Sequence, residues 1–281
     1  MIGFVTSLPH PANCASYAAR CALMEPTLAF LLRQTNPDIH LVIVANTPPE
    51  CTLPDDPRLE VVLVDFARSA STPGRPSLVG IEKDKGAKLA AGTSILTRRG
   101  ASHVMFVDSD DYIHRDIAAF AAERPGHPGW YFDSGYFHIR GERKVTTVTH
   151  EYHQRNGTSH VMRTDLLSVP AYLDLALDRE AMLDAAGRDK TTQIMGRHWP
   201  VVDYFRSIGH PLEPYPYPAA IWEIGTGENC TAVVAASGTK EPIEGRISED
   251  FGLPVPSRAT AARATTSVFL TRVRRHLRPD S

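Results

Sequence analysis

The sequence predicts an α/β protein, a single domain with a central, mostly parallel mixed sheet flanked by helices. The alternation of strand and helix patterns predicts this fold class, and the composition bounds the class of protein. Short apolar runs, typical of strands buried on both faces of a sheet, alternate along the first half with segments of helical periodicity. The composition is that of an ordinary globular protein, with 22% charged residues and a formal net charge of −2 in 281 residues. That charge gives no indication of a nucleic-acid partner.

Each element of the first half has a defined apolar pattern. Strands are predicted at Ile2–Val5, Leu41–Val44, Val61–Val64 and Val104–Val107. Helices are predicted over Ser16–Gln34, Ile81–Arg98 and Ile113–Ala122, with Pro26 expected to interrupt the first and open a second helix. This order of strands and helices implies right-handed crossovers, so neighbouring strands are expected to be parallel.

The second half does not continue the alternation of strands and helices. After Gly129, the segments Trp130–Ile139 and Lys144–Thr149 are expected to pair as strands, and short helices follow. We expect one domain over residues 1–237 and a C-terminal surface segment with a basic amphipathic tail over residues 238–281. The surface segment is expected at Lys240–Pro256.

Four apolar residues of the tail share one helical face, which favours docking on the domain itself; contact with an anionic membrane surface is the alternative. They are Phe269, Leu270, Val273 and Leu277.

The first residues and the apolar runs indicate a cytoplasmic protein. Met1 leads directly into Ile2-Gly-Phe-Val5, a strand pattern rather than the basic and apolar pattern of a secretion signal. No apolar run approaches the roughly 20 residues of a membrane-spanning helix. The expected location is therefore the cytoplasm, at the inner face of the membrane if the tail binds lipid.

The most informative stretch is Asp108-Ser-Asp-Asp111, which directly follows the predicted strand Val104–Val107. In extended backbone, side chains two residues apart point the same way, so Asp108 and Asp110 are expected to converge. Two carboxylates held close repel each other unless a proton or a cation lies between them. They stand at the carboxyl end of a strand, where open α/β sheets place ligands. Such oxygen ligands suit Mg²⁺ or Mn²⁺, which in turn suits a diphosphate. The alternative is that Asp110 or Asp111 caps the next helix.

Several segments together resemble the nucleotide-sugar-dependent glycosyltransferases of the GT-A fold, in particular the family 2-like bacterial enzymes. They cover about residues 1–235 and are Phe4-Val-Thr-Ser7, the strand-terminal Asp65, Asp84-Lys-Gly-Ala-Lys88, Asp108-Ser-Asp-Asp111, Gly157-Thr-Ser159 and Gly225-Thr-Gly-Glu-Asn229. The resemblance implies a GT-A-like (Rossmann-like) domain that uses Mn²⁺ or Mg²⁺. It implies transfer of a hexosyl group from a UDP- or GDP-sugar to a glycan, lipid or small-molecule acceptor.

The resemblance also implies which residues bind the donor. They are Thr6, Ser7, Asp65, Lys85, Lys88, Asp108, Ser109, Glu228 and Asn229; Trp222 joins them because an indole ring can stack on a sugar ring. Lys85 and Lys88 are expected at a helix start, where N–H groups and a cation both favour phosphate. Asp110 is the implied metal ligand, with Asp108 on the metal or on the ribose.

One departure from the family concerns the catalytic base. Related inverting enzymes carry an acidic pair in the second half, whereas the equivalent stretch here, Met195–Asp203, has no Glu-Asp pair. His198 is the first candidate base, because an ordinary pKa of about 6.5 suits neutral pH, and Asp203 is the second. The missing pair leaves open a nucleotide-sugar-binding domain without catalysis. A sugar-nucleotide pyrophosphorylase is disfavoured, because no Gly-rich loop follows the first strand.

Overall fold

The computed structural model describes residues 1–69, 77–226, 238–257 and 260. The strands are β1 Ile2–Ser7, β2 Ile39–Ala45, β3 Leu59–Leu63, β4 His103–Phe106, β5 Tyr112–Ile113, β6 Gly129–Tyr131, β7 Gly135–Ile139, β8 Lys144–Val148, β9 His160–Arg163, β10 Glu213–Pro214, β11 Ala220–Ile224 and β12 Lys240–Pro242. The α-helices are α1 Tyr17–Leu31, α2 Leu78–Arg98, α3 Ile117–Ala122, α4 Arg179–Ala185, α5 Arg188–Lys190, α6 Val201–Ser207 and α7 Arg246–Phe251. Shorter helical turns are η1 Pro11–Asn13, η2 Tyr152–Gln154, η3 Thr164–Leu167 and the π-helical η4 Thr191–Met195.

The larger sheet confirms the predicted fold class. Its seven strands lie in the order β10-β6-β9-β4-β1-β2-β3. β4, β1, β2 and β3 are parallel to one another, and β9 lies antiparallel between β4 and β6. The predicted buried strand at Val104–Val107 therefore occupies the middle of a mostly parallel mixed sheet, and the carboxyl ends of the parallel strands share one edge.

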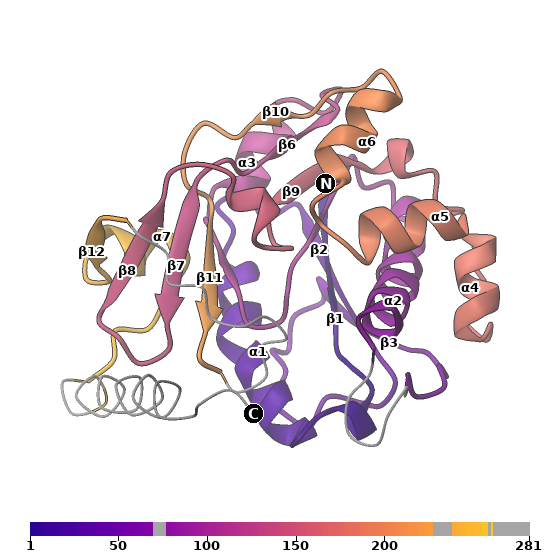
Figure 1. Cartoon of the computed structure of the whole chain (residues 1–281), viewed down its shortest axis with the longest axis horizontal. Helices are drawn as coiled ribbons and strands as arrows, with labels where there is room; N and C mark the ends of the chain where they lie inside the picture. Colours follow the sequence, from indigo (N-terminus) through magenta and orange to yellow (C-terminus); the bar gives the residue numbers. More distant parts are fainter. Residues whose placement is uncertain (70–76, 227–237, 258–259, 261–281) are drawn as a thin grey trace, which may run out of the picture.

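Helices α1 and α2 cover opposite faces of this sheet (Figure 1). Alternate residues of β1 serve the two faces: Phe4 belongs to the same core cluster as Met24 of α1, whereas Val5 belongs to the cluster of α2. Close packing on the α2 side depends on Gly92, where an added Cβ would lie 2.4 Å from a methyl group of Val5. The sheet is thus buried on both faces, as its continuous apolar strands predict.

A second sheet lies beside the first, on the side of β7 and β8 in Figure 1. Its order is β12-β8-β7-β11-β5, with β7 and β11 parallel and the other neighbours antiparallel. The predicted pairing of Trp130–Ile139 with Lys144–Thr149 is confirmed for the second part of the first segment, because β7 pairs with β8. β5 and β11 matter most for the site, because they hold the residues next to the acidic stretch.

Three predicted elements have different bounds in the structure. Helix α1 continues through Pro26, which costs one backbone hydrogen bond but does not end it. The helix predicted from Ile113 begins only at Ile117, because Tyr112 and Ile113 pair with β11. The segment Trp130–Ile139 is two strands in different sheets, since the chain leaves the first sheet after Tyr131.

The segment Lys240–Pro256 was expected on the surface; most of its residues are exposed or half-buried, and the segment also packs on the second sheet. β12 pairs with β8, and Ile243, Ile247, Phe251 and Leu253 are buried in a core cluster with residues of the second sheet. These apolar side chains hold the segment on the second sheet. The predicted amphipathic tail lies almost entirely outside the described residues. None of the helices described is both long and apolar enough to cross a membrane.

Candidate functional site

The acidic stretch lies directly after β4, at the carboxyl edge of the parallel strands. Its backbone is a turn, with the Asp111 N–H donating to the Asp108 carbonyl over 3.1 Å, rather than the extended chain that was expected. The helix-capping alternative is excluded for this stretch, because α3 begins at Ile117 with Asp116 as its N-cap. The carboxylates of Asp108, Asp110 and Asp111 lie close enough to affect one another's pKa.

Asp111 has a structural place that the sequence did not indicate. Its Oδ2 accepts from the Thr158 hydroxyl over 2.6 Å, and its Oδ1 accepts from the Glu223 backbone N–H over 3.2 Å. The same Thr158 oxygen accepts from the Asp108 N–H over 2.9 Å. Burial raises the pKa of Asp111 well above its usual range, and Asp110 and Asp108 add to that effect. Asp111 therefore joins the acidic turn to β11 and to the loop before β9.

Asp108 is the most accessible of the three carboxylates, with about a third of its side chain exposed, and it is paired with Lys85. The Lys85 Nζ donates to Asp108 Oδ1 over 2.5 Å. Burial would raise the pKa of Asp108, but the Lys85 ammonium, with Arg20 and His198, holds it below its usual range. Gly157 leaves room for this pair, since a Cβ there would lie 3.0 Å from Asp108 Oδ2 and 3.1 Å from Lys85 Nζ.

Asp110 is buried and faces Arg20 of α1, a residue that sequence reasoning missed. Arg20 Nη1 lies 3.3 Å from Asp110 Oδ2. Burial raises the pKa of Asp110; the carboxylates of Asp108 and Glu223 act in the same direction, and the Arg20 guanidinium opposes them. Nothing local in α1 marks Arg20 as a site residue, because its partner lies 90 positions further along the chain.

His198 reaches the same place from the second half of the chain. It follows η4, which packs on α2 through two glycines: a Cβ on Gly86 would lie 2.7 Å from the Thr191 carbonyl, and one on Gly196 would lie 2.3 Å from the Glu82 carbonyl. π-helical turns are frequent at functional sites. Because Glu82, Lys85 and Gly86 all belong to α2, this packing brings His198 towards the Lys85–Asp108 pair.

The ring of His198 is held in one tautomer. Its Nε2 lies 3.1 Å from the Gln154 carbonyl, which can only accept, so Nε2 carries the proton and Nδ1 is the free acceptor. Burial lowers the pKa of His198, and the Lys85 ammonium lowers it further, against the effect of Asp108. The ring is therefore neutral at pH 7. Lys85, Gly157, His160 and His198 line a pocket of about 10 Å³, near the lower limit for a single water molecule.

The expected donor-binding residues lie in several environments. Thr6 and Ser7 end β1, and Asp65 follows β3, so all three lie at the same sheet edge as Asp108. Thr6 is buried with its hydroxyl unpaired, as is Ser109, whereas Asp65 is exposed. Trp222 is half-buried and packs edge-on against Phe137, in the second sheet. Glu228 and Asn229 lie outside the described residues.

Two expectations need correction. Helix α2 begins at Leu78, so Lys85 and Lys88 do not lie at a helix start. The Lys88 ammonium is fully buried and donates to the Leu8 carbonyl over 2.8 Å and to Asp84 Oδ2 over 2.6 Å, which leaves it no face for a phosphate. Asp203 is exposed on α6, where its carboxylate pairs with Arg206 over 2.6 Å.

The arrangement of the possible metal-ligating side chains limits how a metal ion could be bound. Within residues 1–69, 77–226 and 238–257, no group of three or more His, Cys, Asp or Glu side chains is arranged to hold a metal ion. Asp108 and Asp110 remain as a pair of carboxylates, and Mg²⁺ is commonly held by one or two carboxylates together with substrate phosphates. Burial is the main cause of the raised pKa of Asp110, and the Asp108 and Glu223 carboxylates add negative charge that a cation would relieve. These two residues thus fit a cation that arrives with a diphosphate.

Comparisons with known proteins find distant structural matches. No protein-family model and no curated protein matches the sequence. Three solved structures from S. aureus match over most of the chain. TarS 1–349 is 16% identical over 78% of this chain, with a TM-score of 0.34, and TarS 1–349 in complex with UDP is 15% identical over 79%, with a TM-score of 0.37. TarS itself is 16% identical over 79% of this chain, with a TM-score of 0.30. This chain spans 59%, 60% and 36% of those chains, respectively.

Proposed function

We propose that this chain is a GT-A-like glycosyltransferase that moves a sugar from a nucleotide-diphosphate donor, a UDP- or GDP-sugar, to an acceptor hydroxyl. One observation carries the proposal. A carboxylate after the central strand, a lysine of α2 and a neutral histidine from the second half converge at the carboxyl edge of a parallel sheet. Ligands of open α/β sheets bind at this edge. The acceptor class is a glycan, a lipid or a small molecule.

Each residue has a proposed role that follows from its charge and its exposure. Asp108 and Asp110 would hold Mn²⁺ or Mg²⁺ together with the donor diphosphate, and the cation would supply positive charge against the leaving diphosphate. Lys85 adds a positive charge next to Asp108. Thr6, Ser7 and Asp65 hold the nucleoside at the ends of β1 and β3. His198 Nδ1 takes the acceptor proton, because its other nitrogen is already committed to the Gln154 carbonyl.

Nucleotide binding tests the donor part of this proposal. Titration calorimetry with UDP and GDP should show binding that Mn²⁺ strengthens, and Asp110→Asn should remove that gain because one of two metal-binding carboxylates is lost. If Asp110→Asn keeps the full gain from Mn²⁺, Asp110 is not a metal ligand. If the unmodified protein binds no nucleotide diphosphate, the donor class is wrong.

Turnover of the donor tests the base. His198→Ala should reduce turnover about 10²- to 10⁴-fold while leaving nucleotide affinity unchanged, because a general base acts on the acceptor and not on the donor. Asp203→Asn is the comparison variant and should retain full turnover, since Asp203 is paired with Arg206 on the exposed side of α6. Nucleotide binding without any turnover would instead favour the non-catalytic binding domain.

A further inference from the structure

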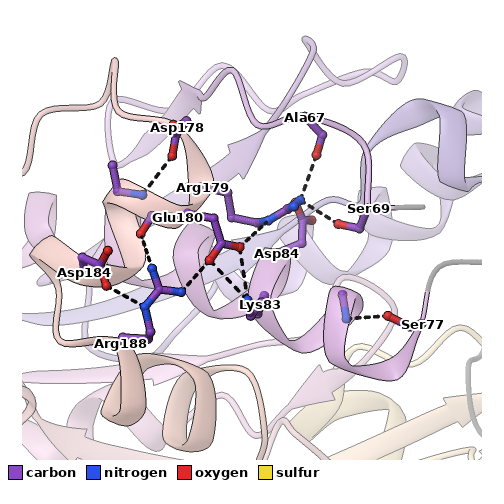
Figure 2. Close-up of polar contacts among 12 residues, drawn as sticks. Ala67, Ser69, Ser77, Lys83, Asp84, Asp178, Arg179, Glu180, Asp184 and Arg188 are labelled. Atoms are coloured by element: carbon purple, nitrogen blue, oxygen red, sulfur yellow. Dashed lines mark hydrogen bonds and ion pairs between the residues drawn. The ribbon is translucent and has the colours of Figure 1, made fainter. Parts of the chain in front are cut away.

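A buried charge network lies beneath the sheet edge that would hold the nucleoside. Lys88 bonds the Leu8 carbonyl, directly after β1, and pairs with Asp84. Arg179, at the start of α4, donates from Nη1 to the Ala67 carbonyl over 2.8 Å and to the Ser69 hydroxyl over 2.7 Å, and it lies 3.8 Å from Asp84 Oδ1. Figure 2 shows Arg179 between Asp84 and the segment of Ala67 and Ser69. Asp84 thus joins the chain after β1 to the chain after β3.

Most of the network is shielded from water, and Arg179 is its most exposed member, with 17% of its side chain accessible. Lys88 is 0% exposed, Asp84 7% and Ser69 6%. Burial lowers the pKa of Lys88, and the Asp84 carboxylate opposes that effect. A buried ion pair adds little net stability, because desolvation offsets most of the Coulomb attraction. Its clearest physical consequence here is geometric, since three carbonyl or hydroxyl oxygens from two separate segments are held at set positions.

The position of Arg179 is fixed by the start of helix α4. Asp178 accepts from the Ala181 N–H over 2.9 Å and caps the helix, so Arg179 is its first residue. Glu180 of α4 also forms an exposed ion pair with Lys83 of α2 (Figure 2). Ser69 in turn packs on α2, where a Cβ on Gly80 would lie 3.3 Å from the Ser69 Cβ.

The two segments carry the residues expected to meet the nucleoside. Thr6 and Ser7 immediately precede Leu8, and Asp65 precedes Ala67 by two residues. The segments are neighbours, because the Arg68 Nε, in the second, donates to Asn13 Oδ1, which lies shortly after Leu8 in the chain, over 3.0 Å. We propose that Asp84 and Arg179 are positioning residues that hold these two segments at the spacing a nucleoside requires. This inference rests on the proposed nucleotide donor.

The test compares two arginines of the same region. Arg179→Lys keeps the charge, but a single ammonium on a different stem cannot reproduce the planar guanidinium contacts. Arg188→Lys is the matched control, because among the described residues Arg188 pairs with Glu180 and Asp184 and with no residue of either segment. Arg179→Lys should weaken binding of UDP or GDP, whichever the unmodified protein binds, about 3- to 30-fold, and Arg188→Lys should leave it within about twofold. Asp84→Asn is a second test variant and should behave like Arg179→Lys.

Two further readouts separate positioning from general destabilisation. Affinity for the free nucleoside should fall with that for the nucleotide, whereas affinity for inorganic pyrophosphate should stay unchanged, because the network does not underlie the acidic turn. Hydrogen exchange of the ligand-free variants should quicken at residues 65–69. Unchanged nucleotide affinity with unchanged exchange overturns the inference, as does an equal loss for pyrophosphate. If the unmodified protein binds no nucleotide, the proposed function fails, and exchange at residues 65–69 alone decides whether the network anchors the segment.

Discussion

Replacing Gly196 by alanine should displace the segment that carries His198. Gly196 has ordinary helical backbone angles, φ −73° and ψ −28°, so alanine meets no conformational penalty there. Its Cβ, however, would lie 2.3 Å from the Glu82 carbonyl and 2.7 Å from the Thr192 carbonyl. Ordinary contact begins near 3.4 Å. Because both atoms are helical backbone, the His198 segment has to move by about 1 Å.

The size of the effect follows from that movement. Overpacking of this kind costs about 1–3 kcal/mol in the free energy of unfolding. A displacement of about 1 Å at a catalytic group costs on the order of 10² in turnover. We therefore expect Gly196→Ala to lose both stability in urea titration and turnover of the donor. Nucleotide affinity should change less than either, since Thr6, Ser7 and Asp110 lie on other elements.

Gly126→Ala is the control, because Gly126 is exposed and a Cβ there meets nothing within 4 Å. Its free energy of unfolding should stay within about 0.5 kcal/mol of the unmodified protein. The reasoning is refuted if Gly196→Ala is as stable as Gly126→Ala and turns over the donor at the unmodified rate. That result would mean that the contact between η4 and α2 is loose and that His198 is not held by it.

Two more predictions concern buried charge. Lys88→Met should lower the free energy of unfolding by about 3–5 kcal/mol, because it leaves buried Asp84 without its closest cation. Lys83→Met, on the same helix, is the control and should cost at most about 1 kcal/mol. Equal losses of the two variants in urea titration would contradict the prediction. Burial lowers the pKa of His160 well below its ordinary value, with His153 and His198 acting in the same direction, so the unfolded chain takes up that proton first. Its contribution to stability should be complete above about pH 6.5 and fall below it by up to about 1.4 kcal/mol per pH unit, and His160→Asn should reduce that slope. A magnetic resonance titration in which the His160 ring gains its proton near pH 6.5 would rule this out.

The arrangement of the first half could be predicted because its signals are local. Uninterrupted apolar runs marked β1, β2 and β4 as buried strands, and the turn of acidic residues after β4 stood where a parallel sheet exposes its carboxyl edge. His198 could be chosen from its residue type and place in the chain, and the structure brings it beside Lys85. Of the second sheet only the β7–β8 pair could be predicted, since β5 and β12 have two and three residues and β11 pairs with strands distant in sequence.

The sequence by itself determined where the buried strands and the long helices of the first half form and which edge of the sheet carries carboxylates, because periodicity and apolar runs report local burial directly. Only the tertiary structure decided the partner of each charge. Lys88 pairs within its own helix and is buried, Arg20 reaches Asp110 across 90 positions, and Arg179 reaches Ser69 across 110. A side chain's type states what it can bind, but its burial and its partners depend on how distant segments pack. That packing separates Lys85, which stays at the site, from Lys88, which lies beneath it.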